Sequence, residues 1–116
     1  MSAKSPRESE TATVSEPVEV AKVGDMAVGQ GRTCALADGR SIALFRTEAG
    51  FFAIDNDCRH RGGPLGEGFL EGPVVTCPWH GWRFDVTTGV SPDDPAACVA
   101  SHPVTVVGDS VRVEIR

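Results

Sequence analysis

The sequence predicts a single all-β domain, and three observations lead to this fold class. The chain has 116 residues, which is the length of one domain. Its 13 glycines and 8 prolines indicate many turns, and these favour short strands over a helical bundle. No window shows the periodicity of an amphipathic helix, whereas residues 111–115 alternate apolar and charged side chains with the period of a half-buried strand.

The strands expected in the first half of the chain are separated by turns that contain glycine. Val18 begins the first strand, and Gly24-Asp25 ends it. Asp38-Gly39 lies between two apolar segments, a pattern typical of a hairpin turn. The strands expected in this half cover residues 18–23, 33–36, 41–47 and 51–54.

In the second half, two short strands flank a Cys-His pair, and a hairpin across Gly108-Asp109 closes the chain. These strands are expected at residues 74–76, 82–86, 104–107 and 111–115. At the other end, residues 1–17 are rich in Ser, Thr and Glu and have few large apolar groups. We therefore expect a disordered polar tail, followed by one folded domain over residues 18–116.

The net charge of −5 argues against nucleic acid as a partner, because phosphate backbones attract a basic surface. No stretch has the length of a membrane span, and residues 1–16 show no export signal. A cytoplasmic protein with reduced thiols is therefore expected, which favours a metal site over disulfides for the four cysteines.

Two pairs of cysteine and histidine give the strongest functional signal. Cys58-x-His60 is followed by sixteen residues and then by Cys77-x-x-His80. Each pair offers one thiolate and one imidazole, and both ligand types suit iron. Such a set can hold a [2Fe–2S] cluster in which two histidines replace two cysteines on one iron. The sequence thus predicts a one-electron carrier, in which the two cysteines can bind an inner iron and the two histidines an outer iron.

We expect the two pairs on two loops at the tip of a rigid β-scaffold. Glycines beside them let the backbone approach closely, and their N–H groups can point at cluster sulfur. Prolines stiffen the loops, and apolar side chains shield the site from water. The residues expected in these roles are Gly62, Gly63, Pro64, Leu65, Gly66, Gly68, Pro78, Trp79, Gly81, Trp82 and Phe84.

The segments CRHRGGPL (58–65) and CPWHGWRFD (77–85) resemble the two signature boxes of Rieske [2Fe–2S] proteins, and the similarity covers about residues 18–116. The resemblance implies a small antiparallel β-sandwich with an inserted cluster-binding subdomain, whose loops cover about residues 57–69 and 76–86. It also implies one [2Fe–2S] cluster. The ligands it implies are Cys58, His60, Cys77 and His80.

Within this family, the Rieske subunits of quinol oxidases carry an extra cysteine in each box, joined as a disulfide, and a Ser and a Tyr that donate hydrogen bonds to cluster sulfur. Here Gly63 and Trp79 stand at the cysteine positions, so that disulfide cannot form. Trp82 and Phe84 stand at the Ser and Tyr positions. The resemblance is therefore to a low-potential Rieske-type ferredoxin.

Such a ferredoxin would carry one electron from an NAD(P)H-dependent flavoprotein reductase to a terminal oxidoreductase such as a ring-hydroxylating dioxygenase, and would not be an enzyme by itself. An alternative is the small subunit of an NADH-dependent nitrite reductase complex. A catalytic oxygenase would need a second domain with a 2-His-1-carboxylate iron, for which 116 residues leave no room. A zinc-stabilised interaction module is a remoter alternative, because zinc sites usually pair Cys with Cys and His with His.

Three further residues with reactive side chains lie outside the two boxes. Cys34 falls in a strand and is expected to pack as a small buried hydrophobe. Cys98 could be exposed and reactive, but burial is preferred. His102 is expected as an ordinary surface or half-buried histidine. Three arginines near the boxes are interpreted either as a solvated set or as a docking surface, and these are Arg59, Arg61 and Arg83.

Overall fold

The computed structural model describes residues 17–58, 63–79 and 81–115, and in these residues it confirms the all-β fold. Short 3-10 helices at η2 (Val23–Asp25) and η3 (Leu65–Glu67) are the helical turns of the described chain. The strands are β1 (Val18–Lys22), β2 (Gln30–Ala35), β3 (Ser41–Thr47), β4 (Gly50–Asp55), β5 (Phe69–Glu71), β6 (Val74–Thr76), β7 (Arg83–Asp85), β8 (Ser101–His102), β9 (Val104–Val107) and β10 (Ser110–Val113).

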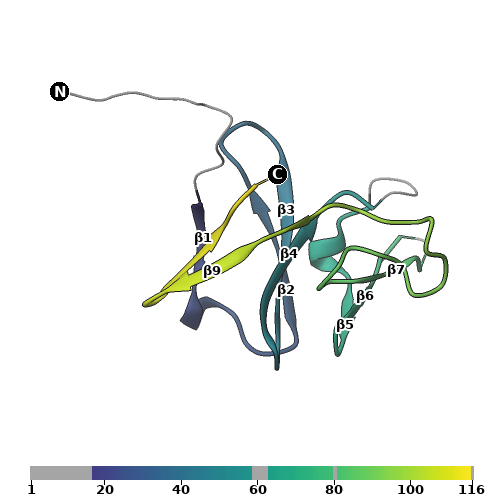
Figure 1. Cartoon of the computed structure of the whole chain (residues 1–116), viewed down its shortest axis with the longest axis horizontal. Helices are drawn as coiled ribbons and strands as arrows, with labels where there is room; N and C mark the ends of the chain where they lie inside the picture. Colours follow the sequence, from purple (N-terminus) through teal and green to yellow (C-terminus); the bar gives the residue numbers. More distant parts are fainter. Residues whose placement is uncertain (1–16, 59–62, 80, 116) are drawn as a thin grey trace.

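Three antiparallel sheets make up the described part of the chain (Figure 1). One sheet has the order β2-β3-β4-β8, and a second, β1-β10-β9, brings the first strand beside the last. The third, β5-β6-β7, is inserted between β4 and β8 and lies to one side of the other two. This arrangement is the two-sheet scaffold with an inserted subdomain that the sequence predicts.

β3 is the strand that joins the two hydrophobic cores. Ile42 and Leu44 pack in one cluster with residues of β1, β2, β4 and β10, whereas Ala43 and Phe45 point to the opposite face. On that face they meet Leu65 and the inner side chains of the inserted sheet. Successive strand residues point to opposite faces, so an uninterrupted apolar run indicates a strand buried on both sides. The inserted sheet is thereby packed directly on the scaffold.

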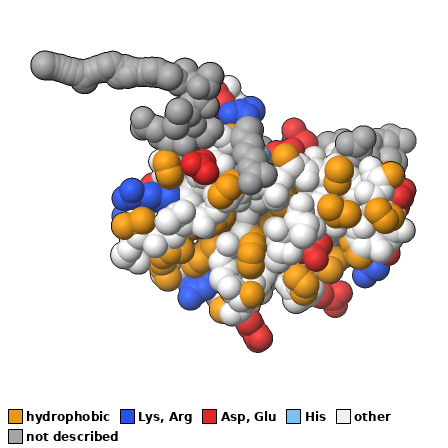
Figure 2. All heavy atoms as spheres, in the orientation of Figure 1, with side chains coloured by type: hydrophobic (Ala, Val, Ile, Leu, Met, Phe, Trp, Pro, Cys, Tyr) orange, Lys and Arg blue, Asp and Glu red, His pale blue; other side chains and the backbone are white. Residues whose placement is uncertain are grey.

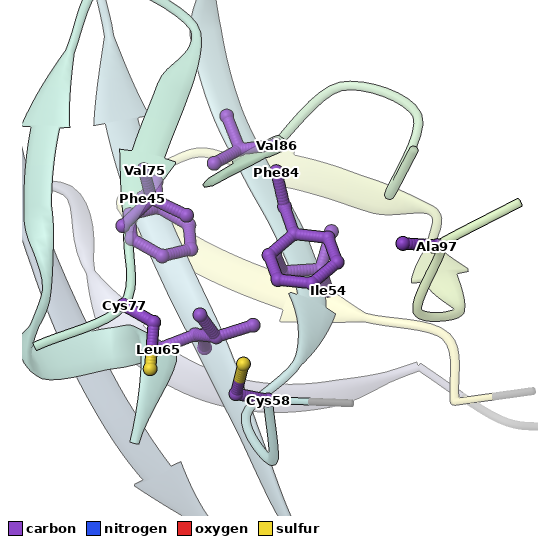
Figure 3. Packing of buried hydrophobic residues seen from close by; sticks show 10 residues of the cluster. Phe45, Ile54, Cys58, Leu65, Val75, Cys77, Phe84, Val86 and Ala97 are labelled. Carbon is purple, nitrogen blue, oxygen red and sulfur yellow. The ribbon is translucent and has the colours of Figure 1, made fainter. Parts of the chain in front are cut away.

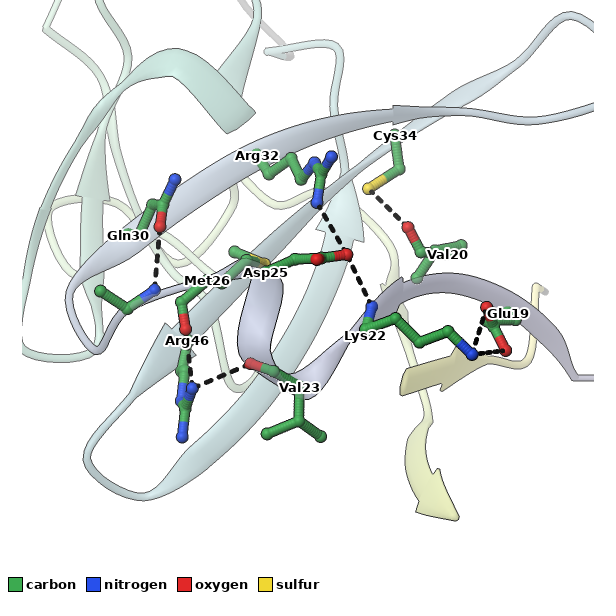
Figure 4. A network of polar contacts seen from close by, with 11 residues as sticks. Glu19, Val20, Lys22, Val23, Asp25, Met26, Gln30, Arg32, Cys34 and Arg46 are labelled. Carbon is green, nitrogen blue, oxygen red and sulfur yellow. Dashed lines mark hydrogen bonds and ion pairs between the residues drawn. The ribbon is translucent and has the colours of Figure 1, made fainter. Parts of the chain in front are cut away.

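The segment between β1 and β2 is fixed by polar contacts (Figure 4). The Arg46 guanidinium donates from Nη1 to the carbonyl oxygens of Val23 at 3.0 Å and Met26 at 2.6 Å. Its Cζ lies 5.1 Å from the centroid of the Phe51 ring. Arg46 therefore satisfies backbone groups that no strand partner reaches.

Most strand boundaries expected from the sequence are confirmed within two or three residues, but β5 and β8 were not predicted. Both are very short, and β5 carries Phe69 with 71% of its surface exposed, so no apolar alternation marks it. The expected disordered tail falls almost wholly outside the described residues. No helix in the described ranges is long and apolar enough to cross a membrane.

The surface of the described chain mixes charge and apolar groups. On the face in Figure 2, acidic and basic side chains alternate without forming one large patch of either sign. Hydrophobic side chains are visible over both the scaffold and the inserted sheet. Exposed apolar groups are normal on a folded protein, so this surface alone does not locate a functional site. The clusters of buried residues are more informative.

Candidate metal centre

Cys58 and Cys77 meet in the same hydrophobic cluster although they come from different elements. Cys58 follows β4, Cys77 follows β6, and each has only 3% of its surface exposed. Figure 3 shows both thiols at one end of this cluster, next to Leu65. The structure therefore brings together the two cysteines that the sequence predicted as ligands. Paired thiols in a water-poor setting are the donor type that soft metal centres use.

Both cysteines begin a loop that is closed by the same kind of hydrogen bond. The N–H of Cys58 donates to the carbonyl of Gly63 at 2.8 Å, and the N–H of Cys77 donates to the carbonyl of Trp82 at 2.7 Å. In each case the acceptor lies five residues after the cysteine. The predicted ligands His60 and His80 fall between these closing residues in the sequence, and both lie outside the described residues.

Gly63 connects the two loops by close contact. A Cβ atom at this position would lie 2.7 Å from the Sγ of Cys77 and 3.1 Å from the Cγ of Trp79. Real side chains do not tolerate such a distance, so the absence of a side chain at Gly63 lets the loops approach. The contact also shows that positions 63 and 79 are neighbours in space.

The residues present fit an iron–sulfur cluster. Two buried thiols lie at one end of one apolar cluster, and a glycine backbone packs against the Sγ of one of them. Thiolates are the usual ligands of such clusters, and burial controls their potential. Within the described ranges no group of three or more His, Cys, Asp or Glu side chains is gathered as a metal site. The two histidines that would complete the donor set are not among those residues.

The expected role of the neighbouring glycines is wrong in part. The N–H of Gly81 donates to the carbonyl of Cys77 at 3.1 Å, that of Gly68 to Leu65, and that of Gly66 to the Asn56 side chain. These N–H groups already have protein acceptors, so they are not the free donors that the sequence predicted. Gly66 and Gly68 instead permit close contacts with the strands β2 and β6. Gly81 supplies a φ of +77° in the second loop, a conformation that other residues rarely adopt.

The apolar side chains near the cysteines divide into two groups. Leu65 and Phe84 are fully buried in the same hydrophobic cluster as the two cysteines. Trp79 is 57% exposed and Trp82 is 37% exposed, so these two indoles shield the site only partly. They leave apolar surface beside the buried thiols, at the loop that Cys77 begins.

Arg83 is one of the three arginines interpreted either as a solvated set or as a docking surface. In the structure it is held in an ion pair with Asp93. Its Nη2 lies 2.6 Å from Oδ1 of Asp93 and its Nε lies 3.0 Å from Oδ2. The hydrogen bond from Arg83 lowers the pKa of the Asp93 carboxyl, and the same bond raises the pKa of Arg83. Arg83 thus fastens β7 to the segment that follows. Arg59 and Arg61 lie outside the described residues.

Cys34 and Cys98 differ in environment. Cys34 is buried as predicted, its Sγ lies 3.9 Å from the carbonyl oxygen of Val20, and burial raises the pKa of its thiol (Figure 4). The preferred burial of Cys98 is wrong, because this residue is exposed. Ala97 and Val99 on either side point inward, so the alternation of an extended chain turns Cys98 outward.

His102 is more buried than expected. Its side chain is only 2% exposed, and its Nε2 lies 2.9 Å from Oδ1 of Asp55. The pair joins β8 to the end of β4, three residues before Cys58. This histidine is therefore part of the scaffold beneath the site.

Asn56 is a buried polar residue near the site that the sequence analysis missed. It is 5% exposed, and its side chain contacts residues of three other elements. The sequence did contain one indication of this role: Asn56 comes directly after an apolar strand and two residues before the predicted ligand Cys58.

An all-β domain that gathers two buried cysteine thiols from two closed loops is consistent with a metal-cluster-binding protein. The particular family follows from comparison with known proteins. A family model described as the Rieske [2Fe-2S] domain matches residues 16–103, and this chain belongs to that family. Its cofactor is one [2Fe–2S] cluster.

The relatives in this family include ferredoxin components of dioxygenase systems. The ferredoxin component of the p-cumate 2,3-dioxygenase system of Pseudomonas putida is 34% identical over 108 residues, covering 91% of this chain and 92% of the relative. The ferredoxin component of the naphthalene 1,2-dioxygenase system of Pseudomonas aeruginosa is 35% identical, covering 67% of this chain and 76% of the relative.

Solved structures agree with this grouping. The ferredoxin of carbazole 1,9a-dioxygenase from Nocardioides aromaticivorans IC177 has a TM-score of 0.80 and 28% identity, covering 88% of this chain and all of that one (100%). A ferredoxin in complex with its oxygenase, from a carbazole 1,9a-dioxygenase, has a TM-score of 0.78 and 30% identity, covering 84% of this chain and 92% of that one. The chain is an electron-transfer component of the ferredoxin type.

Proposed function

We propose that this protein is the ferredoxin of a ring-hydroxylating dioxygenase system. It accepts one electron from an NAD(P)H-dependent flavoprotein reductase and delivers it to the terminal oxygenase. The observation that carries the proposal is the pair of buried thiols brought together by two loops with matching closure. It is supported by relatives that are ferredoxin components of such systems and match most of the chain.

The ligand assignment is part of the proposal. Cys58 and Cys77 hold the iron that stays ferric, and His60 and His80 hold the iron that is reduced. When bound, the cluster supplies a one-electron redox couple. The protein contributes the rest: closed loops that fix the thiolates, buried side chains that exclude water behind them, and a domain over residues 18–116 that keeps loops 57–69 and 76–86 in place. Residues 1–17 are a polar tail outside this domain.

The partner surface is proposed at the end of the molecule where the cysteines lie. Trp79 and Trp82 expose indole surface there, directly beside buried thiols. Tryptophan is enriched in protein interfaces because it offers a large, rigid apolar surface. A terminal oxygenase docking on this surface would bring its acceptor near the cluster. In one related structure a ferredoxin is seen in complex with an oxygenase.

Two measurements test the proposal. Protein produced with an iron supply should contain about two iron and two sulfide per chain and should take up one electron from NADH through a flavoprotein reductase. Adding a ring-hydroxylating oxygenase and its aromatic substrate should then give hydroxylated product. Cys58→Ser and Cys77→Ser should each abolish the visible absorption. A colourless protein with one zinc and no sulfide would contradict the assignment.

The alternative role, small subunit of a nitrite reductase complex, predicts a different result from the dioxygenase role. Two solved structures described as nitrite reductase small subunits from their sequences share the fold at 22–23% identity, and this level of identity supports no assignment of function. If the protein purified from its own cells came bound to a large sirohaem-containing subunit and reduced nitrite, the dioxygenase role would be wrong.

A further inference from the structure

Asn56 is the most highly connected buried polar side chain near the proposed ligands. Its Oδ1 accepts a hydrogen bond from the N–H of Gly66 at 2.8 Å and another from the hydroxyl of Thr33 at 3.1 Å. Its Nδ2 donates to Oγ of Ser41 at 3.4 Å. One amide thus connects β2, β3 and η3 at a place where the residue itself is 5% exposed. Buried polar groups of this kind are retained where they fix one arrangement.

The backbone around Asn56 closes the base of the segment that carries Cys58. The carbonyl of Asn56 accepts from the N–H of Leu65 at 2.8 Å, and Asp57 is paired with Pro64. The next contact on this ladder is the bond from the N–H of Cys58 to Gly63. Residues 56–58 therefore pair with residues 65–63 in antiparallel fashion. The side chain of Asn56 anchors the first of these contacts.

η3 packs closely against β2 at Gly66. A Cβ atom at Gly66 would lie 2.6 Å from Oγ1 of Thr33 and 2.7 Å from the backbone carbon of Arg32. Gly66 and Thr33 are the same residues that donate to Oδ1 of Asn56. The contact of η3 with β2 and the hydrogen bonds of Asn56 thus form one junction beneath Cys58 and Gly63.

We propose that Asn56 is a positioning residue for the cluster, which sets the place of Cys58 and Gly63 by holding this junction. The inference rests on the proposed function, in which Cys58 is a ligand. Removing the amide would leave the buried N–H of Gly66 without its acceptor. A buried donor without an acceptor is costly, so η3 would shift until water reached it. Gly63, which packs on Cys77, and Cys58 would move with it.

The test uses the full chain carrying its cluster and a graded set of variants. Asn56→Ala removes all three side-chain bonds, Thr33→Val removes one donor, and Ser41→Ala removes the longest bond. The matched control is Val111→Ala, which makes a cavity in the other hydrophobic cluster. Thermal unfolding shows which variants have equal global stability.

Three readouts are followed: the rate of cluster loss to an iron chelator, the electron paramagnetic resonance spectrum of the reduced protein, and amide exchange at Gly66. Asn56→Ala should lose its cluster at least about tenfold faster than wild type, as expected when a residue supporting a metal ligand is removed. It should also alter the spectrum and speed the exchange. Thr33→Val should show a smaller change in the same direction, and Ser41→Ala the smallest.

Val111→Ala, at equal or lower stability, should keep the wild-type spectrum and Gly66 exchange. If Asn56→Ala behaves like Val111→Ala in all three readouts, the positioning role is overturned. If the wild type binds no cluster, the proposed function fails, and exchange at Gly66 alone then decides whether Asn56 holds this junction.

Discussion

Gly63 lies against the sulfur of Cys77: a Cβ atom added at Gly63 would be 2.7 Å from that Sγ. Gly63 belongs to the segment after β4, and Cys77 follows β6. The contact therefore joins the two loops that the sequence separates by more than a dozen residues. Any side chain at position 63 has to displace the sulfur or the Trp79 ring, which would lie 3.1 Å away at its Cγ.

The first prediction is that Gly63→Ala weakens binding of the cluster while the scaffold still folds. The methyl group would enter the space of Cys77 Sγ, and mutation of a residue that orients a metal ligand typically costs roughly 10- to 100-fold in metal affinity. Iron and sulfide analysis with visible absorption measures the effect. Gly24→Ala is the control, since a Cβ at Gly24 meets nothing within 4 Å. Equal cluster content in the two variants would show that the contact is tolerated.

The second prediction concerns the two cysteines outside the boxes. Iodoacetamide should label Cys98 in the folded protein and leave Cys34 unlabelled, because Cys98 is exposed and Cys34 is buried with a raised pKa. The raised pKa means that the folded protein keeps the Cys34 proton longer than the unfolded chain does. The resulting stabilisation is present below the ordinary thiol pKa and is lost as the pH rises through the folded value. Peptide mass spectrometry identifies the labelled site.

A double variant completes this test. Cys34→Ala with Cys98→Ala should retain the visible spectrum and the iron content, because neither thiol lies in the cluster of buried residues that contains Cys58 and Cys77. Replacing Cys34 leaves a small cavity and should lower stability by about 1 kcal/mol. Loss of the cluster in a folded double variant would mean that the ligands are misassigned.

The third prediction compares two carboxyl groups whose pKa values are lowered for different reasons. For Asp93 the largest cause is the hydrogen bond from the Arg83 side chain, whereas for Asp38 it is the backbone N–H of Arg40, followed by that side chain. Arg83→Gln should therefore return the pKa of Asp93 close to its ordinary value. Arg40→Gln should leave the largest single cause of the lowered pKa at Asp38, the backbone hydrogen bond, in place. Carbon-detected NMR titration of the two carboxyl groups measures both.

The sign of the corresponding pH effect follows from these directions. A carboxyl with a lowered pKa stabilises the folded state above the ordinary Asp value of about 3.9, and this contribution is lost as the pH falls through the lowered value. Both groups are exposed, so solvent screens them and the effect on unfolding should be small. An equal response of Asp38 and Asp93 to loss of the arginine side chain would contradict the assigned causes.

The sequence predicted the scaffold well because its strands carry strong local signals. The apolar residues between Ser41 and Thr47 indicated a strand, and the Asp38-Gly39 turn indicated the hairpin that joins it to the strand before it. β5 gave no such signal: it has three residues, and Phe69 points to solvent. It exists because Leu70 packs on the inserted core and Val75 pairs with it across the sheet. Such support comes from tertiary structure and is invisible in a short sequence window.

The site was predictable only where chemistry dictates residue type. Cysteine and histidine at fixed spacing identified the proposed ligands, and the structure brings Cys58 and Cys77 into one cluster. The role of Asn56 was not predictable, because its partners are 10 to 23 residues away in the chain. The outward position of Cys98 depends on the inward packing of its neighbours, which composition does not show.

The last prediction is a low reduction potential, roughly −150 mV, near the lower end of the Rieske range. Reduction adds negative charge to the cluster, and hydrogen bonds to sulfur raise the potential by stabilising that charge. Phe84 is fully buried in the same hydrophobic cluster as Cys58 and Cys77 and offers no donor. Phe84→Tyr places a hydroxyl there and should raise the potential by tens of millivolts, on the order of 1 kcal/mol per hydrogen bond.

Protein-film voltammetry at neutral pH measures this shift. Phe51→Tyr is the control, because Phe51 packs against the other hydrophobic cluster, beneath Arg46, and should leave the potential unchanged. Trp82→Ser should have a smaller effect than Phe84→Tyr, since the Trp82 side chain is partly exposed and water already competes at that position. A wild-type midpoint well above zero would refute the low-potential interpretation. An unchanged potential in a folded Phe84→Tyr variant would show that the new hydroxyl does not reach cluster sulfur.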